Sequence, residues 1–238
     1  MHAAIVLQAR LSSKRYPKKV LHEFWGVPML EAIFKRQSED LCNEYIKNKG
    51  YNLKVSYIVA TSHEKSDSLI EEISHRNNIT CYRGSLPNVL ERYQEAVSLF
   101  EANNKTKIDI ICRVTADNLT PDYRFLGEHL IWYLTNKVSY GATSRDFPEG
   151  LKCEIFNRSM LTEAFLNASD DFDKEHVTPY IIRNYKNSFF PLEMSKHITY
   201  KSVTLDTIDD AQRIQNIISK NNIMLMCHWE KFLSLNDE

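Results

Sequence analysis

Hydroxyl-bearing and cationic side chains directly follow the first apolar segment of the chain. Residues 3–7 have the composition of a buried strand, and residues 8–21 contain Arg10, Ser12, Ser13, Lys14, Arg15, Lys18 and Lys19. Serine hydroxyls, backbone N–H groups and Arg or Lys donors can bind a polyphosphate where a strand leaves the carboxyl edge of a sheet. We therefore expect a phosphate-binding loop in preference to a basic arm or a solvated loop. It matches neither a Walker nor a dinucleotide pattern, because the chain has no glycine before Gly26.

Two aspartates follow apolar segments elsewhere in the chain. Asp117 closes the β-branched run at 108–114, and Asp206 comes directly after residues 203–205. Carboxylates at neighbouring strand ends suit Mg²⁺, which also takes substrate phosphate oxygens and water. A helix cap is the alternative reading for Asp206 and the preferred one for Asp209. For Asp117, which begins no obvious helix, the pattern leaves a metal site and a structural role equally open.

Strand and helix patterns alternate through the first half of the chain. Strands are expected at residues 3–7, 54–60, 79–82 and 108–114, and helices at 28–37, 66–75 and 88–102. This alternation predicts an α/β fold with a doubly wound, mostly parallel central sheet. Ligands bind at the carboxyl ends of the strands in such sheets. The polar strand ends should therefore converge, at Gln8, Thr61-Ser62, Arg83-Gly84-Ser85 and Thr115-Ala116-Asp117.

The second half is expected to complete the same domain, which we take to span residues 1–238. Strands are predicted at 140–143, 153–156 and 202–205, with helices at 159–167, 176–184 and 207–220. Residues 170–173 are expected to form an exposed loop. We expect residues 140–195 to form a small β-containing excursion that covers the site or makes a dimer contact.

Composition limits the possible functions. The net charge of -1 over 238 residues argues against a general nucleic-acid binder. Five single cysteines without a C-x-x-C pair indicate reduced thiols in a cytoplasmic protein, not a disulfide framework or zinc site. We see no signal peptide and no apolar run of membrane length, so neither nucleic acid nor a membrane is expected as a partner.

Seven blocks in order resemble a known family. The run from Gln8 to Leu21 is similar to the "QAR-x-x-S-x-R-x-P-x-K-V-L" signature of nucleotidyltransferases grouped with the spore-coat polysaccharide protein F family. These are relatives of the CMP-sugar synthetases that activate octulosonate and nonulosonate (acylneuraminate-type) sugars. The other six blocks begin at Gly26 (GVPML), Arg83 (RGS with NVLERY), Arg113 (RVTAD), Pro148 (PEGL with EIF), Glu175 (EHVTPY) and Leu205 (LDTIDD).

The resemblance implies a nucleotide-diphospho-sugar transferase (GT-A-like) fold and a cytidylyltransferase. Such an enzyme moves CMP from CTP to an acidic keto-sugar, with pyrophosphate release, Mg²⁺ and a homodimer. Arg10, Lys19, Asp117 and Asp206 would be catalytic, and the two aspartates would hold the metal. Nucleotide binding is implied for Gln8, Ala9, Arg10, Ser13, Arg15, Lys19, Arg83, Gly84, Ser85 and Arg92. Sugar binding is implied for Glu149, Lys152, Glu154, Glu175 and His176.

The chain departs from the family pattern at three places. Ser12 and Lys18 stand where the family usually has glycine, and Asn118-Leu119 replaces a Cys-Pro pair. Lys152 occupies the place of a carboxylate, which leads to the hypothesis that this residue favours an acidic acceptor. A direct catalytic role for His176 is less expected than a sugar-contacting or structural one, because adjacent helix residues point apart.

Two other functions are compatible with the same fold. One is a metal-dependent glycosyltransferase that uses a finished nucleotide-sugar, although Asp117 is not followed by the second Asp of an Asp-x-Asp motif. The other is a non-catalytic binding protein of a glycan pathway. The glycine losses favour it slightly, whereas Arg10, Lys19 and the two aspartates argue against it.

Overall fold

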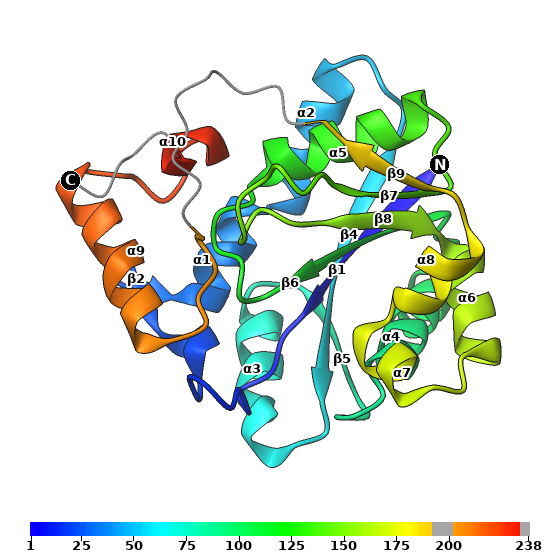
Figure 1. Ribbon diagram of the computed structural model, residues 1–238, viewed down its shortest axis with the longest axis horizontal. Coiled ribbons are helices and arrows are strands. Elements are labelled where there is room, and N and C mark those ends of the chain that lie inside the picture. Colours follow the sequence, from blue (N-terminus) through cyan, green and yellow to red (C-terminus); the bar gives the residue numbers. More distant parts are fainter. Residues whose placement is uncertain (192–201, 234–238) are drawn as a thin grey trace.

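A seven-stranded sheet forms the centre of the molecule (Figure 1). The computed structural model describes residues 1–191 and 202–233. The order across the sheet is β5-β4-β1-β6-β8-β7-β9, and only β8 runs antiparallel to its neighbours. The strands are β1 (His2–Gln8), β4 (Lys54–Ser62), β5 (Thr80–Gly84), β6 (Ile110–Thr115), β7 (Tyr140–Thr143), β8 (Glu154–Asn157) and β9 (Asn187–Phe190). The predicted mostly parallel α/β sheet is confirmed.

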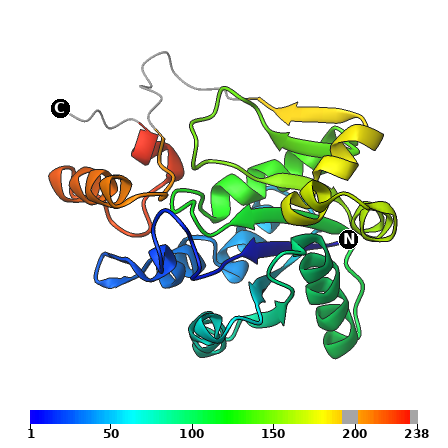
Figure 2. The same cartoon turned by 60° about the horizontal axis from the view of Figure 1, so that its bottom comes forward.

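Helices cover both faces of this sheet (Figure 2). One core lies under α1 (Met29–Arg36), α2 (Glu39–Asn48), α3 (Ser68–Arg76), α5 (Tyr123–Thr135), α9 (Ile208–Lys220) and α10 (Trp229–Leu233). The opposite core lies under α4 (Val89–Asn104), α6 (Arg158–Asn167) and α8 (Pro179–Asn184). Residues 3–7 of β1 are all apolar because both faces of the strand are covered: Ile5 faces the first core and Val6 the second.

Short elements complete the described chain. The turn η1 (Lys19–Leu21) and the hairpin of β2 (Glu23–Phe24) and β3 (Val27–Pro28) follow the basic loop, η2 (Lys65–Asp67) precedes α3, and α7 (Asp171–His176) precedes α8. Within residues 1–191 and 202–233, no helix combines the length and the apolar character needed to span a bilayer.

The parallel register brings the polar strand ends to one edge of the sheet. Gln8, the last residue of β1, lies opposite Ala60 of β4 and Thr115 of β6. Arg83 of β5 lies opposite Thr61 in turn. The loops that follow these strands therefore leave the sheet at a common edge, as predicted.

Three local predictions were wrong. Residues 202–205 form no regular strand, and Thr204 makes only an isolated bridge with Asn118. The helix expected at 176–184 begins only at Pro179, as α8, because Val177 adopts a φ of +71° and His176 ends α7. Asp171–His176 is helical where residues 170–173 were expected to be an exposed loop, since Asp170 caps α7 and Asp173 is buried beside Arg183.

The segment expected to contain a small β-containing excursion within the domain supplies strands to the main sheet. β7, β8 and β9 continue the sheet beyond β6, and α6 to α8 connect them. Residues 192–195 of that expected segment lie outside the described residues. The dimer contact proposed for it stays a prediction.

Candidate active site

The loop after β1 is closed on itself and tied to the rest of the site. Lys18 N–H donates to Leu11 O over 2.8 Å, and Ala9 N–H donates to Ala60 O over 3.3 Å. Lys18 closes the loop in the left-handed region, at φ 60° and ψ 22°. Only glycine adopts this conformation without steric cost. The position where the family usually has glycine is thus a position that favours glycine by its backbone geometry.

A buried carboxylate holds the base of the loop. Asp67, fully buried at the junction of η2 and α3, accepts a 2.8 Å hydrogen bond from Leu11 N–H. Its other oxygen accepts from the hydroxyl of Ser62 at the end of β4. Sequence analysis missed Asp67 because it lies in a polar turn, where aspartate is common for local reasons.

The ammonium group of Lys19 lies between the two aspartates. Lys19 Nζ is 2.9 Å from Asp206 Oδ1 and 3.5 Å from Asp117 Oδ2. Arg15 Nη2 lies 2.9 Å from Asp206 Oδ2. The Lys19 side chain is 12% exposed and those of Asp117 and Asp206 are 31% and 25% exposed. Carboxylates 89 positions apart in the sequence therefore meet the basic loop at one point.

Asp206 is positioned by the segment on either side of it. Leu205 N–H donates to Asp117 O over 2.9 Å, which ties the two aspartate backbones together. After Asp206, Thr207 and Asp210 form a capping box at the start of α9. Asp206 is thus not the capping residue, and Asp209 lies in the first helical turn without capping it.

Gly150 supports the same segment from the other side. It adopts a φ of +102°, and a Cβ there would lie 2.5 Å from the carbonyl carbon of Val203 and 2.7 Å from Thr204 N. Val203 N–H donates to Glu149 O over 2.7 Å. Glycine is required because the two backbones approach too closely for a side chain.

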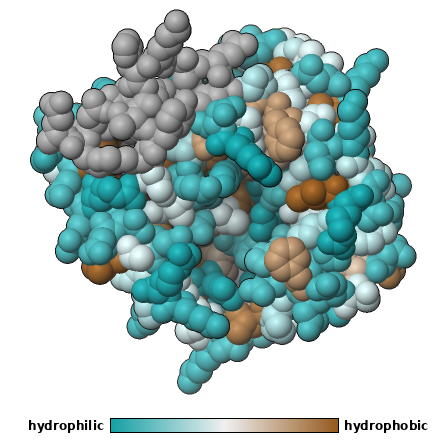
Figure 3. Space-filling view, in the orientation of Figure 1, coloured by the Kyte–Doolittle hydropathy of each residue, from teal (hydrophilic) through white to brown (hydrophobic). Residues whose placement is uncertain are grey.

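Two cavities open on either side of the aspartate pair. The first, about 530 Å³, is lined by the loop residues Gln8, Ala9, Arg10, Ser13, Lys14, Arg15 and Lys19 together with Glu175 and His176. The second, about 940 Å³, is lined by residues from β7, β8 and the following loops, including Thr143, Arg145, Glu149, Lys152 and Glu154. The two cavities share Arg113, Thr115, Asp117 and Asp206. Figure 3 shows that hydrophilic side chains dominate the face of the molecule in this view.

The residues predicted to bind nucleotide fall into two groups. All of those from Gln8 to Lys19 line the first cavity. Arg83, Gly84, Ser85 and Arg92 line neither cavity. Arg83 is held by Glu71 and by the carbonyl oxygens of Ser62, His63 and Glu64. Arg92 is fully buried, and its Nη2 donates a hydrogen bond to Leu86 O. Gly84 packs against the Arg92 side chain.

The residues predicted to bind sugar also divide. Glu149, Lys152 and Glu154 line the second cavity, whereas Glu175 and His176 line the first, with the basic loop. Glu149 and Lys152 form an ion pair with each other. Glu154 is engaged by Arg113, Tyr140 and Thr178. Each role stays a prediction, but the geometry separates His176 from the cavity that contains Glu149, Lys152 and Glu154.

The aspartate pair can accommodate a divalent cation. Within the part of the chain that the structure describes, no three His, Cys, Asp or Glu side chains gather as a ready-made metal site. Asp117 and Asp206 nevertheless point at one cation, the Lys19 ammonium. Two carboxylates with the remaining positions left to phosphate oxygens and water are a donor set that suits Mg²⁺.

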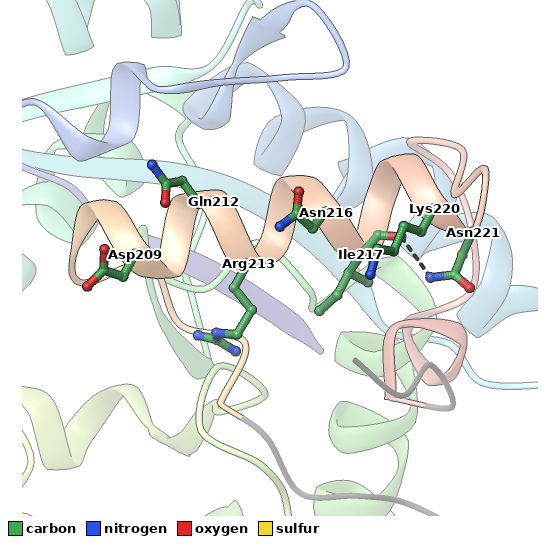
Figure 4. Close-up of a pocket in the computed structure, with 7 residues that line it drawn as sticks. All are labelled: Asp209, Gln212, Arg213, Asn216, Ile217, Lys220 and Asn221. Atoms are coloured by element: carbon green, nitrogen blue, oxygen red, sulfur yellow. Dashed lines mark hydrogen bonds between the residues drawn. The ribbon is translucent and has the colours of Figure 1, made fainter. Parts of the chain in front are cut away.

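A further depression lies apart from this site (Figure 4). It has a volume of about 410 Å³ and is lined by α9 and the residue after it: Asp209, Gln212, Arg213, Asn216, Ile217, Lys220 and Asn221. It shares no lining residue with the two cavities at the aspartate pair. Asp209 therefore belongs to another surface than Asp206.

Comparisons with known proteins identify the family of the chain. The sequence matches the family described as cytidylyltransferase over residues 3–232. It is 31% identical over 209 residues to the uncharacterized protein MJ1063 of Methanocaldococcus jannaschii, covering 86% of this chain and 78% of that one. It is 26% identical over 219 residues to the spore coat polysaccharide biosynthesis protein SpsF of Bacillus subtilis, covering 90% and 85%.

A solved structure extends the agreement to the fold. The structure of a cytidylyltransferase from Leptospira borgpetersenii superposes with a TM-score of 0.79 at 24% identity, covering 97% of this chain and 91% of that one. The family match spans nearly the whole chain and includes the basic loop, Asp117 and Asp206. The protein therefore belongs to the cytidylyltransferase family, a family of CTP-using nucleotidyltransferases related to SpsF.

Proposed function

We propose that the protein transfers CMP from CTP to a hydroxyl of an acidic keto-sugar of the octulosonate or nonulosonate type. Pyrophosphate is the second product, and the CMP-sugar serves the synthesis of a surface polysaccharide or another glycan. The observation that carries the proposal is the Lys19 ammonium held between Asp117 and Asp206, where the two cavities meet. The name of the Bacillus subtilis relative agrees with a glycan pathway.

The first cavity supplies the cations for a triphosphate. Arg10 and Arg15 provide forked donors for phosphate oxygens, and Lys19 provides a point charge. The acceptor enters the second cavity, and its hydroxyl oxygen forms the new bond to the α-phosphorus. The bond from the α-phosphorus to the bridging oxygen of pyrophosphate breaks, and the hydroxyl proton leaves to solvent. Positioning and charge stabilisation dominate such a transfer, so the protein needs no covalent intermediate.

Asp117 and Asp206 would hold Mg²⁺ beside the transferring phosphate. When bound, the ion would neutralise charge that develops on the phosphate oxygens. In this arrangement Lys19 gives up its two carboxylate partners and turns its ammonium towards the triphosphate. The Lys19 ammonium remains paired with anions where the two cavities meet, because phosphate oxygens replace the two carboxylates.

The proposal is tested with a panel of four nucleoside triphosphates, Mg²⁺ and several acidic and neutral sugars, read by pyrophosphate release. We expect release only with CTP and an acidic keto-sugar. Product formed from a finished nucleotide-sugar, with no pyrophosphate, would instead identify a glycosyltransferase. The absence of calorimetric heat with CTP and Mg²⁺ would identify a non-catalytic binding protein.

A further inference from the structure

Arg113 occupies the wall between the two cavities. It lies on β6 directly opposite Glu154 of β8 in the antiparallel register. The two side chains are 17% and 18% exposed and form an ion pair through Arg113 Nη1. Arg113 is one of four residues that line both cavities, and the only cation among them. A charge on the interior of an otherwise apolar strand needs such a partner.

Glu154 is occupied by protein donors. One oxygen accepts from the Tyr140 hydroxyl and, over 2.7 Å, from the Thr178 hydroxyl, and the other accepts from Arg113. Burial alone would raise the pKa of Glu154, but Arg113 and the two hydroxyls lower it overall. Glu154 is therefore a fixed carboxylate that orients Arg113, and it has little capacity left for a sugar.

The guanidinium of Arg113 retains one donor that the protein uses weakly. Nη2 donates to Gln8 Oε1 over a long 3.3 Å. Nε has no hydrogen-bond partner among the described residues, but it is closed off from solvent and so does not reach a ligand in either cavity. Lys152, in the second cavity, is paired with Glu149 on the exposed rim. Of the cations that line the second cavity, Arg113 is the one that also lines the first, and its Nη2 can donate to a carboxylate oxygen.

We propose that Arg113 binds the carboxylate of the acceptor and selects acidic acceptors, with Glu154 as a positioning residue. This inference rests on the proposed function. In the cyclic form of a 2-keto sugar acid, the anomeric hydroxyl and the carboxylate are attached to the same carbon. An acceptor whose anomeric hydroxyl meets the α-phosphorus where the two cavities join therefore brings its carboxylate to the wall where Arg113 lies.

The test compares an acidic acceptor with its carboxamide analogue in wild type, Arg113→Gln, Arg113→Lys and the double variant Arg113→Gln/Glu154→Gln. We expect KM for the acidic acceptor to rise roughly 10- to 100-fold in Arg113→Gln, and the preference over the carboxamide to shrink equally. Arg113→Lys should recover part of the preference. The double variant removes the buried pair together and so separates lost binding from an unpaired Glu154.

Arg158→Gln is the matched control. Arg158 is 14% exposed and pairs with Glu101, but it lines neither cavity. The substitution Arg158→Gln should lower the melting temperature without changing the acceptor preference. Thermal unfolding and CTP calorimetry on every variant confirm that the protein is folded and that the nucleotide side is retained.

The outcomes separate the two proposals. If wild type prefers the acid and Arg113→Gln keeps that preference, the role of Arg113 is refuted and the proposed function stands. A rise in the dissociation constant for CTP, with acceptor preference intact, would assign Arg113 to phosphate instead. Pyrophosphate release from neutral acceptors alone, or from none, overturns the proposed acceptor class and the role of Arg113 with it.

Discussion

In the basic loop after β1, Lys18 departs from the family pattern, and its backbone conformation sets the cost in stability. Lys18 has φ 60°, a conformation that costs an L-residue about 1–2 kcal/mol relative to glycine. It is exposed, and its backbone N–H is already used by Leu11 O. The loop therefore adopts at Lys18 a backbone conformation that glycine would take at a lower cost.

A direct comparison of Lys18→Gly with Lys18→Ala tests this strain. We expect the free energy of unfolding, measured by chemical denaturation, to be about 1 kcal/mol higher for the glycine variant than for the alanine variant. Lys14, in the same loop at a φ that is not positive, is the control. There the alanine variant should be the more stable of the two, because glycine adds unfolded-state entropy. The same order at both positions would contradict the prediction.

At Asp117 we predict a loss of turnover without a loss of folding. Asp117→Asn keeps the size of the side chain but removes a charge from the junction, so kcat should fall roughly 100-fold or more. Stability should change by only about 1 kcal/mol, since the carboxylate is 31% exposed and its ion pair with Lys19 is long. Pyrophosphate release measures the first effect and thermal unfolding the second. Asp209→Asn, on the separate surface of α9, should behave as wild type.

At the scale of elements, the site depends on a segment that has no regular structure. Residues 202–206 are held by Asn118, Glu149 and the backbone of Asp117, not by a sheet of their own. Their alternating pattern resembles a strand, but an apolar alternation forms a strand only where a neighbouring strand has free backbone groups. Asp206 therefore owes its place to Gly150 and Asp117 rather than to a strand end.

The substitution Gly150→Ala tests this dependence. The new Cβ would meet the backbone of Val203 at 2.5 Å, and a φ of +102° is itself unfavourable for alanine. We expect the melting temperature to fall by several degrees and pyrophosphate release to fall with it, because Asp206 moves with residues 203–205. Gly26→Ala separates the two effects: Gly26 also has a positive φ, +72°, but its Cβ would meet nothing within 4 Å. It should lose stability alone, and equal losses of activity in both variants would refute the argument.

Elements with strong periodicity could be predicted from the sequence, and those fixed by distant contacts could not. β1, β4, β6, β7 and α4 lie where the apolar pattern predicted them, within a few residues. Helix α7 was missed because its acidic sequence is typical of a loop. Asp170 caps it and Asp173 pairs with Arg183, a contact ten residues away. Strand β9 forms at the sheet edge by pairing with β7, which local sequence does not reveal.

In the candidate site, too, local patterns in the sequence were predictable and contacts between distant residues were not. The basic-loop side of the first cavity was predictable because its residues, from Gln8 to Lys19, lie in one run after one strand. Arg113 could have been recognised as a charge within the apolar strand β6, which requires a partner of opposite sign. Its partner Glu154 lies on another strand, 41 residues away, so only the pairing of β6 with β8 reveals the ion pair.

At the scale of the whole molecule, the two cores on either face of the sheet hold the cavities at one edge. The core over α5 also joins distant parts of the chain through an aromatic cluster. Phe125 contacts Phe147 and Trp229 edge to face, and His129 stacks on Phe190 with ring centroids 3.7 Å apart. The loop that contains Gly150 begins just after Phe147, so this cluster links the global fold to the second cavity.

We expect His129 to make the stability of this core sensitive to acid. Its Nδ1 lies 2.8 Å from Phe125 O, and Nε2 has no partner among the described residues. Burial lowers the pKa of His129 to about 3. Between that value and the ordinary pKa of about 6.5, the unfolded chain binds a proton that the folded protein does not, so stability falls as pH is lowered through this window. At pH 5 the loss from this group should be about 2 kcal/mol relative to pH 7.

His129→Leu should remove that part of the acid sensitivity. We expect its free energy of unfolding to decline less between pH 7 and pH 5 than that of wild type, by about 2 kcal/mol, whatever its stability at pH 7. Buried His2, whose pKa is also lowered by burial, contributes equally to both proteins and cancels in the difference. His75→Leu, on the exposed face of α3, is the control for the loss of a histidine as such. Parallel denaturation curves for wild type and His129→Leu at both pH values would show that the His129 ring is not held neutral by the core.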